Sequence, residues 1–270
     1  MILVNGDACA QVAANDRGLS YGDGVFRTML MQAGKVQNWS LHYAKLADDC
    51  ARLALTCPDK SLFESDISFL SSSNLSGVIK LMVTRGVGQR GYAPQPAASV
   101  TRISMWSTMP QHADDIIHDG IRARWCQLRL GRQPLLAGVK HLNRLENVLA
   151  RAEWQDADIL EGLLSDEAGN VICGTMSNIF VIKGRYLYTP DLSACGIAGV
   201  TRARVLDGAA SLGLMVKVTA LSVADVLAAD EVMVTNSVIG IWQIRALAEK
   251  TWDAGQFTPL IRAYLEMDHD

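Results

Sequence analysis

The sequence lacks the clustered cysteines and histidines that hold a metal ion. Its six cysteines include no Cys-x-x-Cys pair, and its five histidines include no His-x-x-x-His pair. Zinc sites are built from such closely spaced ligands, so we expect no zinc site. We also expect reduced, mostly buried thiols, because the chain starts without an export signal.

Long apolar runs and strong positive charge are also missing. No apolar stretch approaches the roughly 18 residues of a transmembrane helix, and residues 1–7 lack the pattern of a signal peptide. The 25 Lys and Arg are outnumbered by 28 Asp and Glu, which gives a net charge of −3. No strong positive field exists to attract nucleic acid or an anionic membrane. We therefore expect a cytoplasmic protein with neither as a partner.

The composition that is present describes a globular protein. Of the 270 residues, 49% are hydrophobic and 20% charged, enough to build one large or two modest domains. Short apolar runs alternate with helical patterns, so we expect an α+β fold with mixed sheets. The polar stretch 111–120 predicts a linker between an N-terminal domain, 1–110, and a C-terminal domain, 121–270.

The individual elements follow from periodicity and turn residues. We expect strands at 1–4, 24–31, 78–84, 101–108, 121–126, 159–164, 178–182, 186–189 and 231–235. We expect helices at 41–55, 141–154, 200–212, 223–227 and from Thr258 onward. Ser222 and Asp225 have the spacing of a capping box, and Pro259 suits the first turn of the last helix.

Lys140 is the most informative single residue. It lies between a segment that contains Gly138 and an apolar helix predicted from His141. An amine held there near the core would have a lowered pKa and could act as a nucleophile or base. The competing interpretation is a solvated lysine at the start of a helix.

A second candidate is the glycine-rich turn at 196–202, which leads directly into a predicted helix. Its exposed N–H groups and the positive end of the helix dipole could bind a phosphate, with Thr201 adding a hydroxyl. The turn matches neither the dinucleotide nor the P-loop pattern, and an ordinary glycine loop is the alternative.

A third candidate is the loop 85–92, which contains Arg85, Arg90 and Tyr92. Two guanidinium groups and an aromatic ring could bind a carboxylate by bidentate contacts and stacking. An exposed hairpin tip would have a similar sequence.

These segments occur together with two others in a fixed order. The motifs are Tyr-Gly-Asp-Gly-Val-Phe at 21–26, Arg-Gly-Val-Gly-Gln-Arg-Gly-Tyr at 85–92, Lys-His-Leu-Asn-Arg-Leu-Glu at 140–146, Ser-Asn-Ile-Phe at 177–180 and Gly-Val-Thr-Arg at 199–202. Over nearly its whole length the chain resembles the 4-amino-4-deoxychorismate lyases, pyridoxal-phosphate enzymes of the class IV aminotransferase (fold type IV) group. The resemblance implies a smaller N-terminal α/β domain, a larger C-terminal domain with a barrel-like mixed sheet, and a homodimer.

The resemblance also implies an activity: conversion of aminodeoxychorismate to 4-aminobenzoate and pyruvate in folate biosynthesis. Lys140 would form an aldimine with pyridoxal 5′-phosphate and then remove a proton from the substrate carbon that bears nitrogen, before pyruvate is eliminated. The cofactor would act as electron sink. By position, the residues implied at the catalytic and substrate site are Thr28, Arg85, Arg90 and Tyr92. Those implied at the cofactor are Lys45, Cys173, Asn178, Gly199, Val200, Thr201, Asn236 and Ser237.

Two positions depart from the family pattern. Cys173 stands where a glutamate usually pairs with the pyridine nitrogen, and Lys45 stands where an arginine usually binds the phosphate. A neutral thiol stabilises a pyridinium less than a carboxylate does, and lysine lacks the planar guanidinium. These departures keep open a non-catalytic relative that binds the cofactor or a metabolite. A class IV aminotransferase acting on D-amino or branched-chain amino acids also stays open, because all enzymes of the group use the same aldimine.

Overall fold

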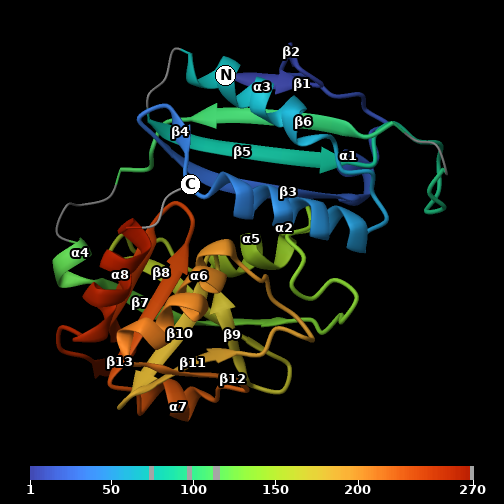
Figure 1. Cartoon of the computed structure of the whole chain (residues 1–270). Helices are drawn as coiled ribbons and strands as arrows, with labels where there is room; N and C mark the ends of the chain where they lie inside the picture. The colour runs from blue at the N-terminus through green and yellow to red at the C-terminus, as the bar shows by residue number, and fades with distance from the viewer. Residues whose placement is uncertain (73–75, 96–98, 112–115, 268–270) are drawn as a thin grey trace. The chain divides into compact units, whose positions relative to one another are not determined.

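The computed structural model describes residues 1–72, 76–95, 99–111 and 116–267 (Figure 1). The chain divides into two units. Unit 1 comprises Met1–Pro110 and the short segment Val139–Asn143, and unit 2 comprises Gln111–Gly138 and the chain from Arg144 onward. Lys140 therefore belongs to unit 1, although the first strand of unit 2 precedes it in the sequence.

Part of the predicted linker 111–120 is helical. Residues 112–115 lie outside the described residues, and the next four residues form the short helix α4 (Ile116–Asp119). Ile116 is buried in a core of unit 2, so α4 is packed onto that unit.

In the described part of unit 1, six strands form one antiparallel sheet in the order β2-β1-β6-β5-β3-β4. The strands are β1 (Ile2–Val4), β2 (Asp7–Ala8), β3 (Gly24–Gln32), β4 (Lys35–Val36), β5 (Gly77–Thr84) and β6 (Thr101–Ser107). The long strands β3, β5 and β6 are the apolar runs from which the sequence predicted strands.

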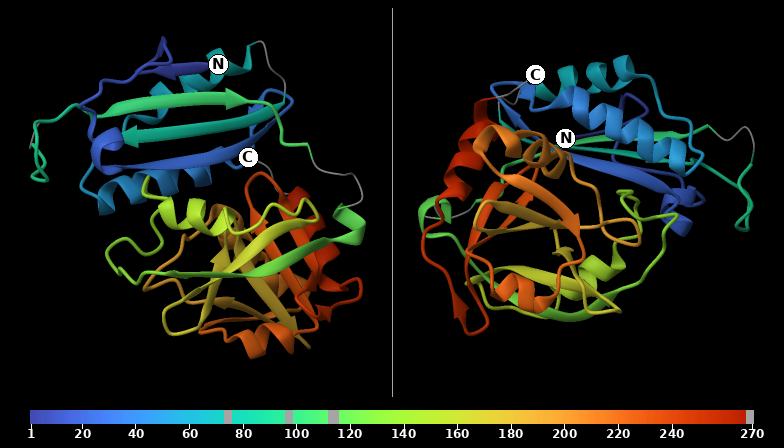
Figure 2. Two further views of the ribbon diagram at one scale, coloured as in Figure 1. Left: turned by 180° about the vertical axis from the view of Figure 1, so that it is seen from behind. Right: turned by 60° about the horizontal axis from the view of Figure 1, so that its bottom comes forward.

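Two helices of unit 1, α2 (Trp39–Arg52) and α3 (Lys60–Ser71), pack on one face of this sheet (Figures 1 and 2). Alternate residues of β3, including Val25 and Met29, are fully buried in the core on that side, which we call the helix face. The residues between them, including Phe26 and Thr28, lie on the opposite face, which we call the second face. The short helix α1 (Arg17–Tyr21) precedes β3.

Unit 2 is built on a mixed sheet, with nine strands in its described part. They are β7 (Ile121–Leu130), β8 (Ile159–Asp166), β9 (Val171–Gly174), β10 (Asn178–Lys183), β11 (Tyr186–Pro190), β12 (Met215–Thr219), β13 (Glu231–Asn236), β14 (Gly240–Leu247) and β15 (Lys250–Thr251). Because β9 pairs with both β8 and β10, the strands β10-β13-β14-β7-β8-β9 close into a barrel. Within the barrel β7 runs parallel to β14 and β8, and the other pairs are antiparallel.

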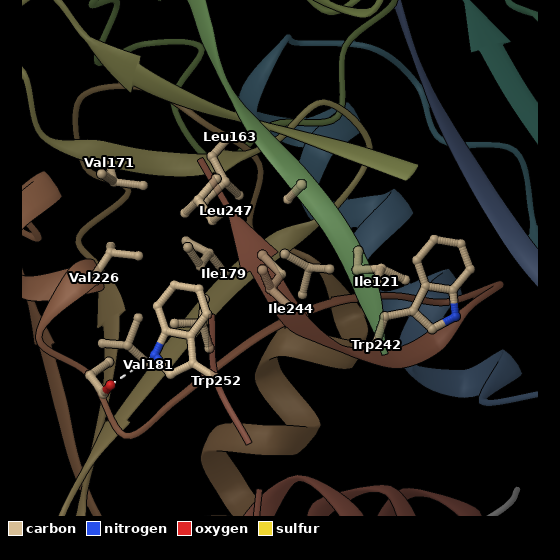
Figure 3. Close-up of a cluster of buried hydrophobic side chains, with 14 of the residues drawn as sticks. Ile121, Leu163, Val171, Ile179, Val181, Val226, Trp242, Ile244, Leu247 and Trp252 are labelled. Atoms are coloured by element: carbon tan, nitrogen blue, oxygen red, sulfur yellow. Dashed lines mark hydrogen bonds between the residues drawn. The ribbon is translucent and has the colours of Figure 1, made fainter. Parts of the chain in front are cut away.

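An apolar core fills one side of this barrel (Figure 3). Leu163, Ile179 and Leu247 come from three different strands and are fully buried beside one another. The indole N–H of Trp252 donates to the carbonyl of Ala229 at 2.9 Å, so this large side chain is buried with its polar atom satisfied. Full burial of each such aliphatic side chain contributes about 1.5–3 kcal/mol.

Besides α4, four helices in the described part of unit 2 lie between or after the sheet strands along the chain. They are α5 (Leu145–Arg151), α6 (Val200–Gly208) with the 3₁₀ turn η1 (Ala209–Leu212), α7 (Val223–Leu227) and α8 (Phe257–Met267). The predicted capping box at the start of α7 is confirmed, since Ser222 and Asp225 exchange both hydrogen bonds. The predicted helix 141–154 is too long at both ends, because α5 spans Leu145–Arg151 and the residues before it pair with β3 up to Leu142. No helix among the described residues is long and apolar enough to cross a membrane.

Candidate active site

Lys140 is held in an extended segment that lies along β3. Its carbonyl accepts the N–H of Phe26, and the N–H of Leu142 donates to the carbonyl of Gly24, both at 2.9 Å. Paired residues of an antiparallel ladder carry their side chains on the same face. Lys140 therefore projects over the second face, where its Nζ lies 4.7 Å from the centre of the Phe26 ring.

The residue before Lys140 projects to the other side. Val139 is fully buried in the core of the helix face, together with residues of α2 and α3. Because side chains alternate along an extended chain, this burial fixes the direction in which Lys140 points. The sequence predicted Lys140 at the start of a helix, whereas in the structure a strand-like pairing holds it.

A second lysine lies beside Lys140 on the second face. Lys80 of β5 pairs directly with Thr28 of β3, and its Nζ is 5.1 Å from the centre of the same Phe26 ring. Burial lowers the pKa of Lys80, and within the described ranges no carboxylate pairs with it. The sequence analysis missed Lys80, although a lysine inside an otherwise apolar strand was a signal for it.

Lys45 of α2 contacts two carboxylates. Its Nζ lies 2.7 Å from Asp48 and 2.6 Å from Asp49. Burial lowers the pKa of the Lys45 ammonium, and the hydrogen bond to Asp48 opposes that shift. The position of the Lys45 ammonium is thus fixed by two neighbouring carboxylates of the same helix.

The loop after β5 is anchored by two arginines around Asp23. The Nε atoms of Arg85 and Arg17 lie 2.8 and 2.9 Å from the Asp23 carboxylate. Burial alone would raise the pKa of Asp23, but the hydrogen bonds from Arg85 and then Arg17 lower it overall. The other two Arg85 nitrogens donate to the carbonyls of Ala54 and Leu53, both at 2.8 Å. Arg85 is therefore fully engaged within unit 1.

The tip of the same loop is exposed. Arg90 is exposed, and Tyr92 is 84% exposed with its ring 5.4 Å from that of Tyr21. Arg17 donates to the carbonyls of Gly91 and Tyr92, so the backbone here is tied to α1. Of the three residues predicted to bind substrate on this loop, Arg90 and Tyr92 have side chains directed to solvent and Arg85 does not.

In unit 2, the turn predicted to bind phosphate leads into α6. Gly199 is the N-cap of this helix and makes no side-chain capping bond. Val200 and Thr201 form its first turn, and the hydroxyl of Thr201 lies 3.1 Å from that of Ser237. Free N–H groups, a helix dipole and two adjacent hydroxyls suit an anion such as a phosphate.

Asn178 shapes that turn. Its side-chain amide donates to the carbonyl of Ile197 at 2.7 Å and accepts the N–H of Gly199 at 3.2 Å. A Cβ on Gly199 would lie 2.4 Å from the Asn178 Oδ1, so this approach needs glycine.

Asn236 shapes the neighbouring turn. Its Oδ1 accepts the N–H groups of Val238 and Ile239 at 2.8 and 2.9 Å, and its Nδ2 donates to Met176 at 3.1 Å. Asn236 thereby fixes the loop that carries Ser237.

Cys173 lies on β9 next to a buried glutamate. Burial, and then the charge of Glu161, raise the pKa of the Cys173 thiol well above its usual value, so the thiol is neutral. Glu161 is fully buried and accepts from Thr175 and Ser177 hydroxyls, each at 2.6 Å. The sequence analysis missed Glu161, whose partners are 14 and 16 residues away.

The predicted residues are divided between the two units. Unit 1 carries Lys140, Lys45, Thr28, Arg85, Arg90 and Tyr92, and unit 2 carries Cys173, Asn178, Gly199, Val200, Thr201, Asn236 and Ser237. The lysine amine of unit 1 and the anion-binding turn of unit 2 have the chemistry that the aldehyde and the phosphate of pyridoxal phosphate require. No three His, Cys, Asp or Glu residues gather into a metal-binding group in the described part of the chain.

Comparison with known proteins agrees with this chemistry. Residues 24–247 match the sequence profile of Amino-transferase class IV. The chain is 35% identical over 250 residues to the aminodeoxychorismate lyase of Vibrio harveyi, covering 92% of each chain. It is 31% identical over 260 residues to a putative branched-chain-amino-acid aminotransferase of Methanocaldococcus jannaschii, covering 94% of this chain and 89% of that one. The crystal structure of 4-amino-4-deoxychorismate lyase from Pseudomonas aeruginosa matches with a TM-score of 0.95 and 42% identity over 99% of both chains.

The chain therefore belongs to the class IV aminotransferase family. Its antiparallel sheet in unit 1 and barrel-like mixed sheet in unit 2 are the fold type IV architecture predicted from the sequence, and that prediction is confirmed. Two of the three relatives named above are aminodeoxychorismate lyases, each similar over more than nine-tenths of the chain.

Proposed function

We propose that this chain is a pyridoxal-phosphate-dependent lyase that converts 4-amino-4-deoxychorismate to 4-aminobenzoate and pyruvate, a step of folate biosynthesis. Full-length similarity to two lyases supports the reaction. One structural observation carries the assignment to residues: Lys140 and Lys80 lie over the same Phe26 ring on the second face, next to Thr28.

Lys140 carries the cofactor and moves the proton. Pyridoxal phosphate, when bound, supplies the electron sink for the charge left after proton removal. Lys140 accepts that proton at Nζ, and the pairing of its backbone with β3 keeps Nζ above Phe26. Holding a base in place in this way is a large part of what a protein adds to cofactor chemistry.

Unit 2 holds the phosphate. The first turn of α6 supplies N–H groups of Val200 and Thr201, and the hydroxyls of Thr201 and Ser237 add two more donors. The family resemblance also assigns Lys45 to the phosphate, to which its ammonium would supply a positive charge. Cys173 stands where the family usually has the glutamate that pairs with the pyridine nitrogen, so it would present a neutral thiol to that atom.

The substrate has two carboxylates, and unit 1 has cations for them. Lys80 is partly buried beside Thr28 and supplies one charge, while Arg90 on the exposed loop supplies a second, with Tyr92 adding a ring surface. Arg85 supports the base of this loop through Asp23 rather than binding substrate itself.

The neutral thiol at Cys173 favours the lyase over an aminotransferase. It would weaken the electron sink, because a neutral thiol stands where the family usually has the carboxylate that pairs with the ring nitrogen. Elimination that forms an aromatic product is steeply downhill and tolerates a weaker sink. An aminotransferase must instead direct the return of a proton to the cofactor. No aromatic product forms in that step, so it has no comparable driving force.

A second copy of the chain is the partner we propose. On α5, the apolar side chains of Leu145, Val148 and Leu149 are all exposed. An exposed apolar face of this kind is typical of a subunit interface. The cytoplasmic location stays a prediction from composition.

One assay tests the reaction. The purified holoenzyme is given enzymatically made aminodeoxychorismate, and 4-aminobenzoate fluorescence and pyruvate are followed together. We expect equal amounts of both products. Absence of product with the cofactor bound would contradict the lyase, and formation of pyridoxamine phosphate with D-alanine or a branched-chain amino acid would identify an aminotransferase.

A further inference from the structure

A buried carboxylate, Asp49, lies under the segment that carries Lys140. The Asp49 side chain on α2 is 0% exposed. Its Oδ2 accepts a hydrogen bond from the guanidinium of Arg27 and another from the backbone N–H of Lys140, the latter at 3.2 Å. Its Oδ1 accepts a hydrogen bond from the ammonium of Lys45 at 2.6 Å. One carboxylate thus touches both lysines that unit 1 contributes to the proposed cofactor site.

Arg27, the ion-pair partner of Asp49, is also buried. Arg27 lies on the helix face of β3, and burial lowers the pKa of its guanidinium to about 10, so it remains charged at neutral pH. Its Nε has no hydrogen-bond partner among the described residues. A buried ion pair is weak evidence for stability, because apolar side chains of similar volume often replace it without loss. Arg27 and Asp49 therefore call for another explanation.

If apolar side chains replaced Arg27 and Asp49, the hydrogen bond that the backbone N–H of Lys140 donates to Asp49 would be lost. The carbonyl of Lys140 is fixed by the N–H of Phe26, and its N–H is fixed by Asp49. Because the N–H and the carbonyl of Lys140 are both hydrogen-bonded, its backbone cannot turn away from β3. The Nζ atom therefore stays above the Phe26 ring. The guanidinium of Arg27 holds the same Asp49 carboxylate in place.

We propose that Asp49, held by Arg27, is a positioning residue for Lys140 and Lys45. It fixes the amine that carries the cofactor and orients the cation that assists phosphate binding. The inference rests on the proposed function in two respects, namely that Lys140 carries the cofactor and that Lys45 assists phosphate binding.

The chain offers a matched control at the neighbouring residue. Asp48 also contacts Lys45, at 2.7 Å, but its side chain is 56% exposed and the hydrogen bonds of the described chain do not link it to Lys140. Asp48→Asn and Asp49→Asn therefore remove the same charge and both weaken the Lys45 contact. Among the contacts described above, Asp49→Asn alone also alters the support of Lys140 and leaves Arg27 without its counterion.

A double variant separates positioning from folding. Arg27→Met with Asp49→Leu replaces the buried pair by apolar side chains, which should keep the unit folded. For each variant we would measure the thermal unfolding of the apoprotein, the dissociation constant for pyridoxal phosphate, and the visible circular dichroism per bound cofactor. The last of these reports how rigidly the cofactor is held and does not depend on turnover.

We expect Asp49→Asn and the double variant to bind the cofactor at least tenfold more weakly than wild type and to lose half or more of its visible dichroism. Asp48→Asn should stay within twofold on both. The inference is overturned if the double variant unfolds at the wild-type temperature and matches Asp48→Asn in affinity and dichroism. A visible band that persists in Lys140→Ala contradicts the proposed function itself, and this inference falls with it.

Discussion

The two units hold their proposed site residues in different ways. In unit 1, Lys140, Lys45 and the substrate loop are all held through buried or half-buried carboxylates, Asp49 and Asp23. In unit 2, neutral amides bond to backbone groups instead: Asn178 holds the turn proposed to bind phosphate, and Asn236 holds the neighbouring turn that carries Ser237.

This difference predicts different sensitivities. A buried charge left without its partner is strongly unfavourable, so charge changes should affect unit 1 most. A turn that depends on close backbone approach tolerates no added side-chain atoms, so changes of shape should affect unit 2 most. We therefore expect substitutions that remove a charge to have the larger effects in unit 1, and substitutions that add side-chain atoms to have the larger effects in unit 2.

The largest effect is expected from Lys140→Ala. Removing the amine should lower kcat by at least about a thousandfold, within the range for a general base. The visible band that borohydride abolishes in wild type should be missing. Phosphate binding by unit 2 should survive, so equilibrium dialysis should still detect the cofactor. Loss of all cofactor binding would show that the units do not divide the work in this way.

Gly199→Ala tests the shape of unit 2 and should have the next largest effect. Its Cβ would lie 2.4 Å from the Asn178 side chain, so the turn must open. We expect cofactor affinity to fall tenfold or more with kcat at saturating cofactor little changed. Gly131→Ala is the control, because its Cβ would meet only Glu146 at an ordinary 3.4 Å. Equal affinities in the two variants would contradict a role for this turn.

The sequence predicted those parts of the fold that depend on local signals. The apolar runs of β3, β5 and β10 match the observed strands, and the capping box of α7 is where Ser222 and Asp225 indicated. The glycine turn at Gly199 also leads into a helix as expected. In each case the information lies within a few neighbouring residues.

Features that depend on distant partners could not be predicted in this way. His141 and Leu142 fit the helical periodicity, but pairing with β3 across more than a hundred residues keeps them out of the helix. Asp49 looks like one of two ordinary acids on a helix, and its partners Arg27 and Lys140 are 22 and 91 residues away. The exposed strand β12 has no alternation of burial, so its pattern carried no signal.

Cys173→Glu should have an intermediate effect in unit 2. A carboxylate placed in this buried cluster near Glu161 should lower the stability of the apoprotein by about 1–3 kcal/mol, measured by denaturant unfolding, while leaving it folded. In the holoenzyme the new charge should shift the cofactor spectrum and change the rate. Cys126→Ser, in the same cluster, controls for polarity alone. An unchanged spectrum in Cys173→Glu would show that this residue does not face the pyridine ring.

Asp23→Asn is expected to have the smallest effect, and pH separates it from the others. Arg85 and Arg17 lower the pKa of Asp23, so the ionised carboxylate stabilises the folded state above its unfolded pKa of about 3.9 and loses this contribution as pH falls through the folded value. At pH 7 the variant should be less stable by about 1 kcal/mol, because a hydrogen bond to a charged group is worth about 1.5–3 kcal/mol and one to a neutral group about 0.5–1.5 kcal/mol. The difference from wild type should begin to shrink as the pH drops below about 4, where Asp23 of the unfolded chain becomes protonated, and should vanish only below the lowered pKa of Asp23 in the folded protein. Urea unfolding at pH 7, 5 and 3 measures this trend. A difference that stays constant with pH would mean that Asp23 supports the loop by shape, in the manner of unit 2, and the contrast between the units would not hold at this position.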